Sequence, residues 1–576
     1  MLHFHTKRKN DFYVTPRIFK PVSQVPLDED NTSSSVVQVT GGIKHSKYEI
    51  PDHGIDEEIA YNLIHNELTL DGNPHLNLAS FVNTFSSPIA KRLITENINK
   101  NLADNDEYPQ LIELTQRCIY IISNMWKAGP EDDPIGCATT GSSEAIMLGG
   151  LAMKKAWEHK MSAAGKPIDK PNIVMSSACQ VALEKFTRYF DVECRLVPVT
   201  FESHHALDPN DLWDYVDENT IGLFVIMGTT YTGHFENVQK VSKVLDEIEA
   251  KHPEWSNKGI PIHVDGASGG FIVPFSFTEE QMEKAGLDQW CFNNPRVVSI
   301  NTSGHKFGLT TPGLGWVVWR NQKFLANELR FSLKYLGGVE ETFGLNFSRP
   351  GFQVVHQYFN FVSLGKRGFR EHFGSSLFVA RFFSHRLLNL PGLKGKFSIV
   401  SSIHESIADN SVPREYEQYR EHPELYKPGV PLVAFRFSDE FMNNYPEIPQ
   451  LLLSNMLRTR GWIIPNYPLP KSKDDSEKFE VLRVVFRSEM KLDLAQLLLV
   501  DIDLIMTRLV SSYERLTRQV KFGDQSENAR RAFVYNMLIT VASPETPVEE
   551  EEDESQFAAK REEIHRRITR NYRGTC

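Results

Sequence analysis

Short β-rich runs alternate with helical segments between about residues 110 and 380. Several runs are continuously apolar, which is typical of strands buried on both faces of a parallel sheet. A stripe of aliphatic residues at helical spacing follows Glu236 and predicts a helix between two of the strands. The alternation predicts βαβ units and a mostly parallel sheet. The predicted strands are Asn172–Ser177, Glu193–Val199, Ile221–Gly228, Ile260–Asp265, Val297–Ser303 and Gly315–Arg320.

The pattern changes after about residue 380. Isolated strands at Pro431–Ser438 and Leu482–Arg487 precede an amphipathic helix at Leu492–Leu509, which predicts a smaller α+β domain. Both ends of the chain lack periodicity and carry polar or charged runs, as tails do. We therefore predict a disordered tail at 1–45, a helical segment at 46–110 that contributes to a dimer and a substrate pocket, a large domain at 111–380, a small domain at 381–520 and a charged tail at 521–576.

Composition and charge exclude several classes of protein. The 576 residues carry a net charge of −11, which disfavours binding to nucleic acid and to anionic membranes. No apolar run is long enough to span a bilayer, and the start of the chain lacks the apolar stretch of a signal peptide. Six cysteines without a CxxC spacing do not form a disulfide framework. We expect a cytoplasmic protein that binds neither nucleic acid nor membrane.

The first motif with chemical potential is Thr140-Gly141-Ser142-Ser143-Glu144, which opens a helical run. A helix N-terminus presents unpaired N–H groups and a positive dipole, and two hydroxyls beside it suit a phosphate. Taken alone, the motif is more often an ordinary helix cap. It therefore needs support from other motifs.

Two further motifs follow predicted strands. Asp265 ends a buried strand and is followed by small residues, at the edge where open α/β sheets bind ligands. Lys306 lies in SGHKFG, among small and apolar neighbours that favour a neutral, nucleophilic amine. Alone, the first is more often a turn residue and the second a solvated lysine. Together, the three motifs supply what pyridoxal 5'-phosphate (PLP) requires: a phosphate site, an acid for the ring nitrogen and a lysine that carries it covalently.

The order GSSEA, HVDGASGG, SGHKFG and FSRP resembles the fold-type I, group II PLP-dependent decarboxylases. The segments ASFVNT, NKNLADNDEYPQ and YLGGVEETFGLNFSRP make the chain similar to the fungal-type glutamate decarboxylases, over about residues 55 to 515. The resemblance implies an aspartate aminotransferase-like α/β fold, with a mostly parallel sheet in the large domain. It also implies α-decarboxylation of L-glutamate to 4-aminobutyrate (GABA) and CO2.

The resemblance also implies residue roles. Lys306 is the lysine that carries the cofactor, Asp265 contacts the ring nitrogen, and Tyr335, on a Gly-rich segment, is a candidate proton donor. The other cofactor contacts are Gln180 and Ala267 at the ring faces, Thr230 near the ring hydroxyl, and Ser142, Ser143, His305 and Ser348 at the phosphate. The substrate contacts are Arg483 at the α-carboxylate and Ser80, Phe81, Asn101 and Asp104 at the distal carboxylate. Ser348, Asn101 and Asp104 are expected to act across a dimer interface.

Alternatives remain at this point. The substrate is open between glutamate and another amino acid, aspartate or an aromatic one, and a phospho-sphingoid lyase is a more distant alternative. A catalytically silent PLP-fold scaffold is disfavoured because Lys306, Asp265 and the Gly-Ser-Ser motif are intact. We expect a homo-oligomer of at least two subunits, with a hexamer left open. Calmodulin binding is weakly supported, because the basic C-terminal tail lacks an aromatic-anchored amphipathic helix after Phe557.

Overall fold

The computed structural model describes residues 48–51, 54–104, 106–333, 340–470 and 479–519. Tyr335 and both predicted tails lie outside these residues. The chain divides into two compact units at Asp71/Gly72. The first contains α1 (Glu57–Leu68), whose N-terminus is capped because Asp56 Oδ1 accepts a hydrogen bond from the Glu58 N–H at 2.9 Å. All other elements belong to the second unit.

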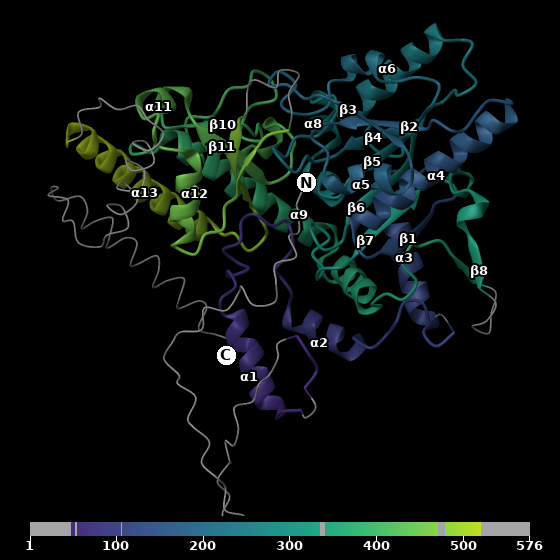
Figure 1. The fold of residues 1–576 in the computed structure, drawn as a ribbon, viewed down its shortest axis with the longest axis horizontal. Coiled ribbons are helices and arrows are strands. Elements are labelled where there is room, and N and C mark those ends of the chain that lie inside the picture. Colours follow the sequence, from purple (N-terminus) through teal and green to yellow (C-terminus); the bar gives the residue numbers. More distant parts are fainter. Residues whose placement is uncertain (1–47, 52–53, 105, 334–339, 471–478, 520–576) are drawn as a thin grey trace, which may run out of the picture. The chain divides into compact units, whose positions relative to one another are not determined.

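A seven-stranded sheet forms the centre of the second unit (Figure 1). The strands β2 to β6 are parallel, whereas β7 lies antiparallel between β1 and β6. The predicted mostly parallel sheet is confirmed. In spatial order the strands are β1 (Ile135–Thr139), β7 (Gly315–Trp319), β6 (Val297–Ser303), β5 (Ile262–Asp265), β4 (Thr220–Ile226), β2 (Asn172–Ser176) and β3 (Glu193–Val197).

The observed strands differ from the predicted ones mainly at prolines. Strand β3 ends at Val197, before Pro198, and β5 begins after Pro261. Proline has no N–H to donate to a neighbouring strand, so it interrupts the ladder. The edge strand β1 was not predicted, because its short run IGCAT consists mainly of small residues and a glycine, which do not favour a strand.

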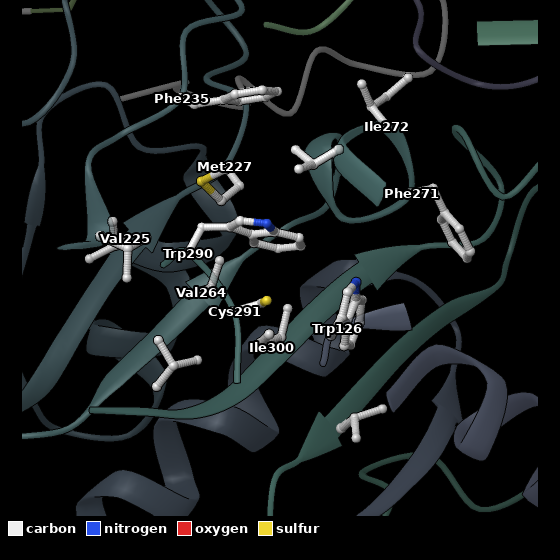
Figure 2. Packing of buried hydrophobic residues seen from close by; sticks show 14 of the residues in the cluster. Trp126, Val225, Met227, Phe235, Val264, Phe271, Ile272, Trp290, Cys291 and Ile300 are labelled. Carbon is white, nitrogen blue, oxygen red and sulfur yellow. The ribbon is translucent and has the colours of Figure 1, made fainter. Parts of the chain in front are cut away.

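Helices cover both faces of this sheet because neighbouring strand residues point to opposite sides. Val225 of β4 packs in one cluster with residues of α3, α6 and α7. Figure 2 shows part of this cluster, with Val225, Val264 and Ile300 from the strands and Phe271 and Ile272 from α7. Phe224, the preceding residue, packs in another cluster with α4 and α5. The helices are α2 (Pro88–Asn97), α3 (Pro109–Met125), α4 (Ser142–Ala163), α5 (Val181–Tyr189), α6 (Val238–Lys251), α7 (Gly269–Ser276) and α8 (Glu279–Lys284).

A second, antiparallel sheet has its own hydrophobic core. Its strand order is β10 (Phe397–Ile399), β11 (Leu432–Phe437), β13 (Glu480–Val485) and β12 (Asn466–Pro468). The helix α13 packs against α9 and α12 (Figure 1). This arrangement matches the expected smaller α+β part, so the predicted fold class is confirmed. The remaining elements are α9 (Phe352–Asn389), α10 (Gln418–Glu421), α11 (Asp439–Asn444), α12 (Gln450–Arg458), α13 (Leu492–Gln519), β8 (Phe331–Leu333) and β9 (Glu340–Thr342).

The long helix α9 joins the two cores. Its residues up to Leu377 contribute Phe369 and Phe373 to the core of the large sheet, and the residues after Leu377 contribute Phe383 to the core of the small sheet. The helix is kinked at Gly365, whose backbone is left-handed with φ 57°. Among the residues that the structure describes, no helix is both long and apolar enough to cross a membrane.

The parallel strands bring the predicted motifs to one edge of the sheet. Asp265 is the last residue of β5, Lys306 follows β6, and Thr230 follows β4. Because parallel strands end at the same edge, residues far apart in sequence meet there.

Candidate active site

A cavity of about 400 Å³ lies at this edge. It is lined by residues from the N-terminus of α4, from the ends of β4 and β5, and from the segment after β6. The predicted site residues that line it are Phe81, Ser142, Ser143, Gln180, Thr230, Asp265, Ala267, His305 and Lys306.

The N-terminus of α4 forms one end of the cavity. Gly141, the N-cap residue, has a φ of 154° and no side chain to cap the first-turn N–H groups. Glu144 in the first turn binds back to Thr140, whose N–H and hydroxyl donate to Glu144 Oε2 at 2.8 and 2.9 Å. The N–H groups and hydroxyls of Ser142 and Ser143 therefore form a site suited to an anion.

His305 lies beside this helix end. Its Nδ1 is 2.9 Å from the carbonyl oxygen of Leu314, and because a carbonyl can only accept, Nδ1 carries the hydrogen. Burial lowers the pKa of His305, and the neighbouring Lys306 lowers it further. The second ring nitrogen is thus left for a ligand in the cavity.

Lys306 is set up as an amine nucleophile. Burial lowers the pKa of its ammonium group, an effect that Asp265 opposes and Arg483 reinforces. Its Nζ lies 5.0 Å from the centre of the Phe81 ring and 3.5 Å from Ser268 Oγ, the long limit of a hydrogen bond. Lysines in such surroundings lose their proton more readily than solvated ones.

Asp265 presents a buried carboxylate to the same cavity. Its Oδ1 accepts hydrogen bonds from the Ala267 N–H and from Asn301 Nδ2, both at 3.0 Å. Donors to a carboxylate stabilise its charged form. An anion therefore faces the cavity with one of its oxygens held by the protein.

Two residues predicted to contact the cofactor ring, Gln180 and Thr230, also form hydrogen bonds within the protein. Gln180 caps α5, because its Oε1 accepts from the Ala182 N–H at 2.7 Å, and its amide nitrogen remains for the cavity. The Thr230 carbonyl oxygen accepts a hydrogen bond from Arg483 at 2.7 Å. These bonds fix the cavity wall before any ligand binds.

Arg483 is held between two aromatic rings. Its guanidinium carbon lies 4.9 Å from the centre of the Phe81 ring and 5.5 Å from that of Tyr467. One terminal nitrogen donates to Thr230 and the other to the Ala79 carbonyl oxygen. Its Nε is buried without a hydrogen-bond partner in the part of the chain that the structure describes. A buried cation with an unused donor is suited to an anionic ligand.

Among the described residues, Ser80, Asn101, Asp104 and Ser348 do not line the cavity, and Arg483 borders it through Phe81, which does. Asn101 Nδ2 donates to Asp104 Oδ1 at 3.0 Å and lies 3.4 Å from Ser348 Oγ, so these three residues form a cluster of their own. Ser80 Oγ accepts from the Val82 N–H at 3.1 Å. Tyr335 lies outside the described residues, so its role stays a prediction.

Sequence reasoning missed several residues around the site. Ser268 lies within the HVDGASGG motif of Asp265, so its place in the cavity could have been predicted from that motif. Tyr467 had no such signal, because it lies in the short strand β12 and meets Arg483 only in the fold. Asn301 lies two residues before the SGHKFG motif and was given no role, although it donates to Asp265.

Comparisons with known proteins agree with this geometry. Residues 49–407 match the pyridoxal-dependent decarboxylase conserved domain. The chain is 62% identical to glutamate decarboxylase of Saccharomyces cerevisiae over 100% of both chains. It is 40% identical to glutamate decarboxylase 1 of Arabidopsis thaliana, covering 86% of this chain and 89% of the relative.

A solved structure of Lactobacillus brevis glutamate decarboxylase superposes with a TM-score of 0.68 at 34% identity, covering 81% of this chain and 95% of that one. The matched domain spans most of the chain, and the identities extend well beyond it. The chain therefore belongs to the pyridoxal-dependent decarboxylase family, and within that family to the glutamate decarboxylases.

Proposed function

We propose that this protein converts L-glutamate to 4-aminobutyrate and CO2 with PLP bound in the cavity. The observation that carries the proposal is the meeting of the α4 N-terminus, Asp265 and Lys306 around one cavity of about 400 Å³. The identity to glutamate decarboxylases over the full length supports the choice of substrate.

The residues of the cavity fit this cofactor. The uncapped first turn of α4 suits its phosphate, and the carboxylate of Asp265 suits a protonated ring nitrogen. When bound, PLP supplies an electron sink for the pair of electrons that CO2 leaves behind. A phosphate dianion near His305 would favour the protonated imidazole and so oppose the effect of burial on its pKa.

Each charged residue of the cavity then has a distinct task. Lys306 provides a neutral amine that holds the cofactor covalently and yields it to the substrate. Asp265 keeps a proton on the ring nitrogen, because an anion beside it favours its charged form. Arg483 orients the α-carboxylate through its unused Nε donor. Gln180, Ala267 and Thr230 line the same cavity, where the first two would confine the cofactor ring and Thr230 would contact its hydroxyl.

Two of the residues predicted at the distal carboxylate, Asn101 and Asp104, do not line the cavity of their own chain. Ser80 and Phe81 lie on the segment at the cavity, and Phe81 lines it. We propose that Asn101 and Asp104 reach the distal carboxylate, and Ser348 the phosphate, in the cavity of a neighbouring subunit. Their grouping in one cluster supports this, because a single contact surface can deliver all three. We propose an assembly of at least two subunits, while a hexamer, calmodulin binding and a cytoplasmic location stay predictions.

A CO2-release panel tests the function. Purified protein with added PLP is offered glutamate, aspartate, tyrosine and tryptophan, with the Lys306→Ala variant as the matched control. We expect release from glutamate alone, because the shorter aspartate cannot reach the distal groups while its α-carboxylate contacts Arg483. Faster release from aspartate or an aromatic amino acid would contradict the proposed substrate.

A further inference from the structure

A chain of buried polar side chains leads away from Asp265 between strands β5 and β6. The register of these strands pairs His263 with Ser299 and Asp265 with Asn301. His263 Nδ1 lies 2.7 Å from Ser299 Oγ, and its Nε2 lies 2.8 Å from Asn301 Oδ1. Asn301 Nδ2 then donates to Asp265 Oδ1 at 3.0 Å. Four side chains on two strands thus form one continuous set of hydrogen bonds.

The direction of these hydrogen bonds follows from the groups involved. Asn301 Nδ2 donates to the carboxylate, so its Oδ1 faces His263 and can only accept. His263 must therefore carry its hydrogen on Nε2, which leaves Nδ1 to accept from the Ser299 hydroxyl. Every donor in the chain points toward Asp265. Aligned hydrogen bonds polarise one another, and this effect is strongest where water is excluded.

Packing fixes the imidazole in this orientation. His263, Ser299 and Asn301 are fully buried. Helix α4 approaches the imidazole so closely that a Cβ added to Gly149 would lie 2.3 Å from His263 Nδ1. The Phe224 ring packs edge-on against the imidazole, with 5.4 Å between the two ring centres. Burial lowers the pKa of His263, which keeps the ring neutral and its single donor on Nε2.

We infer that Asn301, oriented by His263 and Ser299, is a positioning residue that binds one oxygen of the Asp265 carboxylate and directs the other to the ring nitrogen of the cofactor. Among the described residues, both donors to this carboxylate reach Oδ1, so Oδ2 keeps its capacity to accept from a group in the cavity. The inference rests on the proposed function, because it concerns the contact of Asp265 with PLP.

Loss of the Asn301 donor would change where the ring proton resides. A carboxylate with fewer hydrogen-bond donors is more basic. It would therefore draw the proton from the ring nitrogen and leave a neutral pyridine, which accepts electrons less well. A change of about one pKa unit alters the ratio of the two protonation states about tenfold.

The test compares Asn301→Leu with the wild-type holoenzyme and with Asn294→Ser as a matched control. Asn294 is also buried, but it donates to the Gln289 carbonyl and accepts from the Arg296 N–H. Each protein is reconstituted with PLP labelled with ¹⁵N at the ring nitrogen, and the nitrogen chemical shift, kcat and KM for glutamate are measured. We expect Asn301→Leu to move the shift toward neutral pyridine and lower kcat about tenfold with KM unchanged, and the control to alter neither.

A wild-type shift in a folded, loaded Asn301→Leu protein would overturn the inference and leave the proposed function standing. A neutral pyridine in the wild-type holoenzyme would instead overturn the proposed role of Asp265 and the inference with it. If Asn301→Leu does not fold, Ser299→Ala decides. It removes only the outermost hydroxyl, so a smaller displacement of the nitrogen shift in the same direction supports the inference, and no displacement overturns it.

Discussion

The cavity around Lys306 and the cluster of Asn101, Asp104 and Ser348 are positioned in different ways. The cavity groups follow the ends of strands β4, β5 and β6, which a buried sheet holds in register. The cluster groups lie on two connecting segments, which meet where the Leu102 N–H donates to the Arg349 carbonyl oxygen at 2.8 Å. One region is held by the sheet, and the other by a short contact between loops.

This difference matches the tasks that we propose for the two regions. Chemistry requires fixed distances among an amine, an acid and a phosphate site, and a packed sheet supplies them. Enzymes that share one fold select different substrates through side chains that differ between them. Connecting segments can carry such side chains, because their sequence varies without disturbing the core. Variants of the first region should therefore change kcat within their own chain, and variants of Asn101 and Asp104 in the second should change substrate binding in the partner's cavity.

The largest effect is expected from Lys306→Ala, because it removes the amine that carries the cofactor. Glutamate turnover should be lost, while some PLP still binds through the phosphate site. Borohydride treatment of the wild-type holoenzyme followed by peptide mapping should place the cofactor on Lys306. A label on a different lysine would show that Lys306 is not the residue that carries the cofactor.

Asp265→Asn keeps the shape of the side chain but removes its charge. We expect kcat to fall roughly 10²-fold or more, about the loss of one preorganised electrostatic group. Asp246→Asn, on an exposed carboxylate paired with Arg296, is the matched control and should keep its kcat. A near-normal rate in Asp265→Asn would argue against a protonated ring nitrogen.

Mixed assemblies test whether the cluster acts in the partner's cavity. A Lys306→Ala chain should be inactive, and an Asn101→Ala/Asp104→Ala chain should have a raised KM for glutamate. Assembled together, they should regain turnover at normal KM, because the first chain lends its intact cluster to the second chain's intact lysine. If verified mixed dimers show no gain, the cluster does not complete a neighbouring site.

The pH dependence of cofactor attachment tests how Asp265 and Arg483 change the pKa of Lys306. The amine of Lys306 reacts only when unprotonated, so attachment to the cofactor-free protein should rise with pH, with a midpoint below the 10.5 of an ordinary lysine. Asp265 raises this pKa and Arg483 lowers it. Asp265→Asn should therefore move the midpoint down and Arg483→Met should move it up, as measured by stopped-flow absorbance. Midpoints that move in the same direction would contradict this account of the electrostatics.

Removal of the terminal segments should have the smallest effect. A shortened chain that spans about residues 45 to 520 retains every described group of the cavity and of the cluster. We expect its kcat and KM for glutamate to match those of the full chain. A folded but inactive short chain would show that a terminal segment contributes to the site or to the assembly.

Much of the chemistry could be predicted from the sequence because it depends on local motifs. Apolar runs predicted six strands of the large sheet; Asp265 ends one of them and Lys306 follows another, whereas Thr230 was expected only from the family resemblance. In a parallel sheet, a position after a strand already implies a position at the ligand-binding edge. The N-terminus of α4 was predictable for the same reason, since a helix end is a local feature with a known dipole.

What the sequence by itself determined is therefore the fold class, the cofactor and the cavity residues next to strand and helix ends. Only the tertiary structure decided which strand lies beside which, including the antiparallel β7 between β1 and β6. It also decided that Tyr467 stacks on Arg483, and that His263 meets an asparagine 38 residues further along the chain. Such contacts depend on strand order and register. These are set by the packing of whole faces against one another, so no short segment of the sequence encodes them.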